Sequence, residues 1–340
     1  MSRGAERLTV RPLTPGDDLE PELDLTQRAF GPFGAGAREH RRASLRLTVG
    51  AGRQVGAFDD GALVASARYF DARQWWRGRS LPMAAVAGVK VAPHRQGAGL
   101  GRAVVTALLQ RMAGAGYPLS VLYPSTAPLY RSLGWEFAGG LFEATIPARS
   151  LRSLVPHDPV ARAGAGGIAA GPVAADGVDG AVAGRAGGSA FRPAGPGDAA
   201  EMISVLSALY AAERCCGPMT FAAPDLAGFL AASESYVYLA PDGVLDYDWD
   251  TDQGQMMVSR AAAGSAATSR AMWSIVSSHA TMVHRVRVVS SPADPVTWLA
   301  REPDVTLTRT QSWMLRLLDA PAAIAGRGFP ASASLAVPLT

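Results

Sequence analysis

The chain has 340 residues, enough for two or three domains, and its 48% apolar and 18% charged residues exclude a wholly disordered protein. The net charge of +3 is spread without a basic block, so we expect no nucleic-acid partner. No apolar run reaches the roughly 18 residues of a membrane-spanning helix, and the N-terminus lacks an apolar leader, so we expect neither a membrane protein nor a secreted one.

Cysteine usage points to the same setting. The only two cysteines are the adjacent Cys215 and Cys216, which cannot build a disulfide framework or a metal site. We therefore expect a reducing, cytoplasmic location and no bound metal.

The first 150 residues alternate between strand and helix patterns, which predicts an α+β sandwich. In chain order, the predicted elements are a hairpin of strands at 55–58 and 63–70, a strand at 86–92, a helix at 101–113, a strand at 119–123, a short helix at 128–133 and a strand from Trp135.

An internal repeat divides the chain. The pattern R-P-x-x-P-G-D-x-x-E occurs at 11–20 and again at 192–201, and predicts a strand end, a Pro-Gly turn and an aspartate that caps a helix. A Gly- and Ala-rich stretch between the two copies cannot bury enough side chain to offset its ordering entropy. We predict a first domain at 1–156, a linker at 157–190, a second domain at 191–285 and a short third segment at 286–340.

A glycine-rich loop follows the strand at 86–92 and leads into the next helix. Glycine removes the Cβ that would block an anion, and the N-terminus of a helix favours negative charge. The loop has neither the Gly-Lys-Ser/Thr ending of a Walker A loop nor the spacing of a Rossmann loop. On the glycines alone, a turn that binds no ligand is an equally good interpretation.

Two motifs in the same order and spacing favour a ligand. Gln96-Gly97-Ala98-Gly99-Leu100-Gly101 resembles the acetyl-CoA pyrophosphate loop of the GNAT acetyltransferases, and Tyr130–Trp135 resembles their Y-x-x-x-G-[FYW] element. With the second repeat and residues 309–323, the chain resembles the Eis (enhanced intracellular survival) family. In that family two GNAT-like domains precede a sterol-carrier-protein-like domain, so 286–340 is expected to form a truncated third domain.

The resemblance implies where acetyl-CoA binds. The main chain of Val89, Lys90 and Val91 would pair with the pantetheine arm as an added strand, and we expect the Lys90 side chain to be exposed without a role. The pyrophosphate would contact Gln96, Gly97, Ala98, Gly99, Leu100 and Gly101, with added charge from Arg95 and Arg102. Ser125 and Thr126 would face CoA, although an N-cap role for either is equally compatible with the sequence.

The resemblance also implies catalytic roles. Tyr130 would protonate the leaving CoA thiolate as a general acid, and the alternative is a helix tyrosine packed on Trp135. Family members are thought to use the C-terminal carboxylate as the base, which would be Thr340 here. His94 is expected to be a surface turn residue.

The predicted function is acetyl-CoA-dependent N-acetylation of a primary amine on a cationic, aminoglycoside-like small molecule. The alternatives are a non-catalytic CoA-binding or regulatory protein and a protein lysine acetyltransferase. The second repeat has no such glycine loop, so we expect it to bind no CoA. The resemblance further implies a homo-oligomer such as a hexamer, and the apolar third segment, with Trp298, Trp313 and Met314, is expected to pack on the GNAT-like domains or another subunit.

Overall fold

The computed structural model describes residues 8–34, 36–153, 191–250, 253–292, 294, 296 and 305–330. The chain forms two compact units, each built from segments that alternate along the sequence. Unit 1 combines 1–143, 194–237 and 308–340, and unit 2 combines 144–193 and 238–307. The boundaries predicted at 156, 190 and 285 do not coincide with the limits of these units. The boundaries were predicted from composition, which indicates loops, whereas the chain passes from one unit to the other within regular strands. The predicted linker lies outside the described residues.

Unit 1 is built on a mixed sheet with the strand order β1-β2-β3-β4-β5-β13-β6. The bounds are β1 (Thr9–Pro12), β2 (Gln54–Asp59), β3 (Ala62–Trp76), β4 (Arg79–Val91), β5 (Leu119–Leu122), β6 (Glu136–Pro147) and β13 (Thr306–Leu317), and β8 (Cys216–Phe221) pairs with β3. Strands β1 to β4 are antiparallel neighbours, whereas β4 and β5 run parallel. The predicted strands are confirmed, and β3 and β4 are longer than expected because they form one hairpin around Arg77 and Gly78, both at positive φ.

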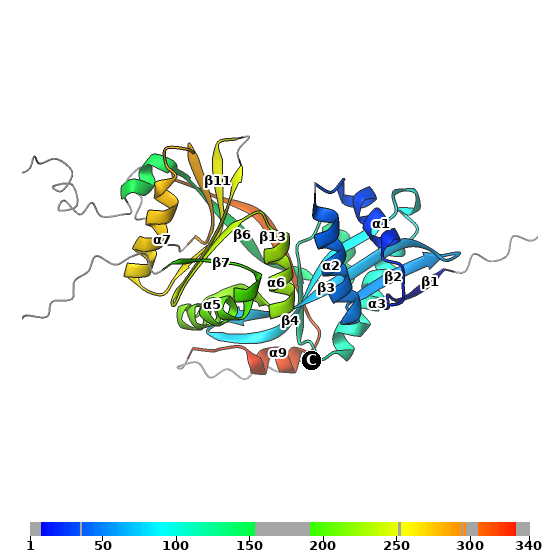
Figure 1. The fold of residues 1–340 in the computed structure, drawn as a ribbon. Coiled ribbons are helices and arrows are strands. Elements are labelled where there is room, and N and C mark those ends of the chain that lie inside the picture. Colours follow the sequence, from blue (N-terminus) through cyan, green and yellow to red (C-terminus); the bar gives the residue numbers. More distant parts are fainter. Residues whose placement is uncertain are drawn as a thin grey trace, which may run out of the picture. The chain divides into compact units, whose positions relative to one another are not determined.

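Helices cover both faces of this sheet. They are α1 (Glu20–Phe30), α2 (Ala37–Gly50), α3 (Leu100–Gly114), α4 (Ala127–Arg131), α5 (Ala199–Glu213), α6 (Ala223–Ala232) and α9 (Ala320–Gly326). Helices α1 and α2 lie over one face and α3 over the other (Figure 1). The alternation of strand side chains explains this: Ala65 and Ala67 are buried in one cluster with Val104 of α3, whereas Ser66 between them hydrogen-bonds to Glu22 of α1.

The repeated R-P-x-x-P-G-D pattern forms the same hydrogen bond from a backbone N–H to its aspartate in both copies. The Asp17 carboxylate accepts a hydrogen bond from the Thr14 backbone N–H at 2.7 Å, and Asp198 accepts one from Gly195 at 2.8 Å. Each aspartate closes its turn. The predicted capping role is wrong for Asp17, because α1 begins after Leu19.

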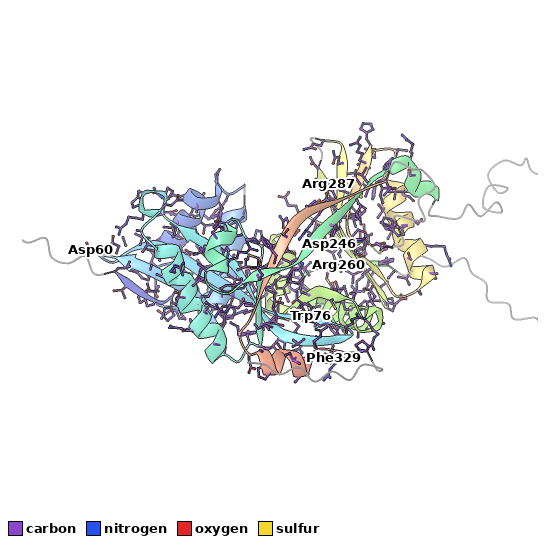
Figure 2. The ribbon with its side chains drawn as sticks, turned by 180° about the vertical axis from the view of Figure 1, so that it is seen from behind. Asp60, Trp76, Asp246, Arg260, Arg287 and Phe329 are labelled. Carbon is purple, nitrogen blue, oxygen red and sulfur yellow. The ribbon has the colours of Figure 1, made fainter. Side chains whose placement is uncertain are left out.

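The third segment is divided between the units: β12 (Arg285–Ser290) and the residues up to 307 belong to unit 2, and residues 308–330 belong to unit 1. Strand β13 pairs antiparallel with β5, and Met314, opposite Leu122, is fully buried in the same cluster as Val104. Trp313 meets Trp76 edge to face, and Arg327 lies over the rings of Trp76 and Phe329, which Figure 2 labels. Packing of this segment on a GNAT-like unit is confirmed. No separate sterol-carrier-like unit is present among residues 305–330, and Trp298 and Thr340 lie outside the described residues.

Unit 2 repeats part of this plan. Its strand order is β6-β12-β11-β10-β9-β7, with β7 (Arg192–Ala194), β9 (Tyr236–Ala240), β10 (Gly243–Asp250), β11 (Gln255–Ala263) and β12 (Arg285–Ser290). Helix α7 (Ala266–Ser278) connects the parallel pair β11 and β12, as α3 connects β4 and β5. In this sheet Asp246 of β10 lies opposite Arg260 of β11, with Arg287 on the next strand (Figure 2).

Helix and sheet packing around β13 predicts a stability difference along that strand. Met314→Ala should lower the free energy of unfolding by about 2–5 kcal/mol, because it leaves a cavity in the core. Leu317→Ala, on the same strand but 48% exposed, should cost less than about 1 kcal/mol. Urea unfolding measures both, and equal losses would contradict the placement of Met314.

Candidate active site

The two parallel strands at the centre of unit 1 separate early. Strand β4 pairs with β5 only from Met83 to Ala85, opposite Leu119 to Val121. Beyond Ala85, six residues of β4 continue without β5, which uses its other edge for β13. Among the described residues, β4 therefore presents an unpaired edge from Val86 to Val91, where an extended ligand could add as a strand.

A β-bulge lies in the middle of this free edge. Ser66 pairs with Lys90 and Arg68 with Ala87, so Gly88 and Val89 together oppose the single residue Ala67. Gly88 has φ +60°, the left-handed conformation of a bulge that begins with glycine. The bulge turns the main chain locally, so that an N–H here can polarise a ligand carbonyl instead of pairing with β3.

The glycine-rich loop follows directly and stays open. Gly97 and Gly99 have φ +82° and +77°, and a Cβ at either would meet nothing within 4 Å. Gly99 is the N-cap residue of the 15-residue helix α3. Because glycine has no side chain, the first N–H groups of the helix receive no capping hydrogen bond from this residue. Residues Gln96 to Gly99 are exposed, as an anion-binding loop requires.

Two arginines beside the loop are held by protein partners. Arg95 forms an ion pair with Asp59, and the Arg102 guanidinium donates to the Ser132 hydroxyl at 2.7 Å. The Arg102 contact joins α3 to the end of α4. His94 is exposed in a 3₁₀ turn, as expected.

Tyr130 lies beside the same loop. Leu129 of α4 and Val91 of β4 both flank Gly101, each 3.7 Å from a Cβ placed there, so α4 is next to the start of α3. Tyr130 is 5% exposed and meets the Trp135 ring edge to face at 6.1 Å. Burial raises the pKa of Tyr130 above its ordinary value, so the hydroxyl keeps its proton at neutral pH. The Tyr130 ring can therefore pack on Trp135 while its protonated hydroxyl remains able to act as a general acid.

The loop before Tyr130 contains the two hydroxyl residues of the predicted site. Ser125 is exposed, and Thr126 is the N-cap residue of α4, but its side chain makes no capping hydrogen bond. Both hydroxyls are therefore free of that structural role.

The expectation for Lys90 is wrong. Its side chain is 3% exposed and forms a 2.6 Å ion pair with Glu22, while its ammonium also donates to the Gly88 carbonyl. Glu22 accepts further hydrogen bonds from Gln54 and Ser66. Sequence reasoning missed Glu22 because α1 is distant in sequence, although a lone lysine among 32 basic residues was a signal.

The described residues of unit 2 contain no comparable loop. Helix α7 begins after Ser265, whose hydroxyl caps it by accepting from the Thr268 N–H. The cap occupies the position where an anion would bind at Gly99 of unit 1. No cluster of metal-ligating side chains is found in the part of the chain that the structure describes. None of its helices is long and apolar enough to span a membrane.

Comparison with known proteins agrees with this geometry. Residues 9–138 and 229–317 each match a family model described as an acetyltransferase (GNAT) domain. The chain is 30% identical over 288 residues to the N-acetyltransferase Eis of Mycobacterium tuberculosis (strain ATCC 25177 / H37Ra), covering 81% of this chain and 65% of that protein. It thus spans just under two thirds of the length of that curated relative.

Solved structures show the same relationship. The GCN5-related N-acetyltransferase from Kribbella flavida is 35% identical with a TM-score of 0.79, over 96% of this chain and 75% of that one. Eis1 from Mycobacterium abscessus shares the fold at 23% identity, with a TM-score of 0.65 over 96% of this chain and 78% of its own. The chain therefore belongs to the GCN5-related N-acetyltransferase (GNAT) superfamily, with two GNAT domains in tandem, and is similar to the Eis proteins.

Proposed function

We propose that the protein is an acetyl-CoA-dependent N-acetyltransferase that acts on a primary amine of a small molecule. The observation that carries this proposal is the unpaired edge of β4, which leads directly to the uncapped N-terminus of α3. A ligand with an extended amide-containing arm and a pyrophosphate matches both features at once. Family membership supports the same reaction.

The residues present fit acetyl-CoA. The main chain of Val89, Lys90 and Val91 would pair with the pantetheine arm, and N–H groups from Gly97 to Gly101 would surround the pyrophosphate. Because Arg95 and Arg102 already have protein partners, the main chain would supply most of the phosphate contacts. Acetyl-CoA supplies the activated acetyl group.

Chemistry would take place where the free edge bulges. An N–H at Gly88 or Val89 would stabilise the charge that develops on the thioester oxygen as the amine nitrogen attacks the carbonyl carbon. The C–N bond forms, the C–S bond breaks, and the Tyr130 hydroxyl gives its proton to the leaving sulfur. The amine loses one proton to a base. The C-terminal carboxylate of Thr340, which the family resemblance implies, lies outside the described residues.

The proposals for the acceptor and the assembly rest on the family resemblance alone. That resemblance favours a cationic, aminoglycoside-like amine and a homo-oligomer such as a hexamer. A thiol-release assay with aminoglycosides, small primary amines, α-amino acids and lysine peptides would test the reaction, beside calorimetry with acetyl-CoA. Acetyl-CoA binding without turnover on any amine would instead favour the non-catalytic CoA-binding alternative. Turnover on peptides alone would favour a lysine acetyltransferase.

Charge at the start of α3 should abolish cofactor binding. Gly99→Asp should remove measurable acetyl-CoA binding in calorimetry, because its carboxylate would occupy the N–H groups that meet phosphate and repel the anion. Gly116→Asp is a matched control, since Gly116 follows the same helix, has the same φ of +77° and is equally open. Unchanged affinity in Gly99→Asp would show that the loop is only structural.

Loss of one hydroxyl should separate binding from turnover. Tyr130→Phe should keep the affinity for acetyl-CoA and the packing on Trp135, while kcat falls roughly 100-fold on the usual scale for a general acid. Tyr117→Phe removes a hydroxyl bonded to Asp71 at the far end of α3 and should leave kcat unchanged. Equal kcat in Tyr130→Phe and the wild type would remove Tyr130 from the mechanism.

A further inference from the structure

A small charged cavity opens on the α1 side of the bulge. It has a volume of about 220 Å³, below the roughly 300–1,000 Å³ of pockets for drug-sized ligands. Gly88 forms part of its wall, with Lys90 and Arg68 beside it: a Cβ at Gly88 would lie 3.5 Å from Arg68 Nε and 3.8 Å from Lys90 Nζ. The cavity therefore borders the point where the proposed acetyl transfer would occur, on the face opposite α3.

The charges around this cavity do not balance. Glu22 is its one carboxylate, and Lys90 neutralises it in a buried ion pair. Arg68 and Arg41 also line the cavity, and neither has a carboxylate partner among the described residues. The other carboxylate that acts on Arg68 is Asp225 of α6, which is already paired with Arg53 at 2.5 Å.

Arg68 has unused hydrogen-bonding capacity. Its Nε is fully buried and has no hydrogen-bond partner within the described residues, and its guanidinium lies over the Phe70 ring at 4.7 Å. Burial is the largest influence on its pKa, which is lowered, and Glu22 offsets this only in part. A ligand carboxylate in the cavity that Arg68 lines would form a charge-assisted contact with its guanidinium.

We propose that the acceptor is a small amine that also carries a carboxylate, as in an α-amino acid, and that Arg68 binds this carboxylate. The inference rests on the acetyl transfer proposed above and names its substrate class. In an α-amino acid the nitrogen is two bonds from the carboxyl carbon, so a carboxylate held at Arg68 leaves the amine beside Gly88. A polycationic acceptor would instead meet three cations and one carboxylate that is already neutralised.

The test compares each amino acid with its own carboxamide, in acetyl transfer by the wild type and three variants. The wild type should acetylate the amino acid with a kcat/KM at least tenfold above that of the amide. Arg68→Gln should raise KM for the amino acid by about 10- to 100-fold, the loss expected for a charge-assisted hydrogen bond, and leave the amide unchanged. Arg68→Lys should recover part of the loss. Arg46→Gln, an exposed arginine of α2 outside the cavity, should change neither.

Calorimetry with the N-acetylated amino acid in the presence of CoA separates this inference from the reaction itself. Binding that is lost in Arg68→Gln, without turnover of any amine, would uphold the anion-binding cavity and reject acetyl transfer. Equal kcat/KM for the amino acid and its amide would overturn the carboxylate preference and leave the acetyltransferase proposal standing. An equal loss of turnover on both substrates in Arg68→Gln would have the same meaning.

Discussion

The early separation of β4 from β5 is the constraint on which the organisation of unit 1 depends. Three residue pairs hold the two strands together, and then β5 ends after four residues while β4 continues to Val91. Backbone groups that would normally pair in a central strand are left for another partner. The same separation leads the chain into the loop of Gly97 and Gly99, whose left-handed conformations open the N-terminus of α3. The free edge of β4 and the open N-terminus of α3, the two halves of the candidate cofactor site, thus follow each other along the chain.

Unit 2 has the same early separation, because β11 pairs with β12 only from Gln255 to Val258 and continues to Ala263, but the start of its connecting helix differs. It has the same parallel pair with a connecting helix, but Ser265 caps α7 with its own hydroxyl. The cap engages the Thr268 N–H and places a hydroxyl at this helix end, so the two units differ where a phosphate would bind although they share a fold. The difference depends on local chemistry at one helix end, namely glycine in unit 1 and serine in unit 2.

The sequence predicted the strands and helices around the loop because periodicity and glycine punctuation are local signals, and α3 at 100–114 matches the expected 101–113. It could not predict the tertiary pairings. Three features join residues that are distant in sequence: the two units alternate along the chain, β13 pairs with β5, and Lys90 is buried against Glu22. The resemblance pointed correctly to the family, whereas the charge balance beside Gly88 became visible only when α1, β3 and β4 were assembled. The sterol-carrier-like third domain was expected from the family resemblance, but residues 308–330 form part of unit 1 instead.

Amide hydrogen exchange, followed residue by residue with and without acetyl-CoA, tests most directly whether the free edge of β4 is the cofactor site. Protection reports hydrogen bonds that form on binding. The account predicts that amides between Val86 and Val91 exchange more slowly when acetyl-CoA is bound, together with those of Gly97 to Gly101, while amides of β10 and β11 in unit 2 do not change. Protection of the loop alone, with the β4 edge exchanging as fast as in the free protein, would contradict it.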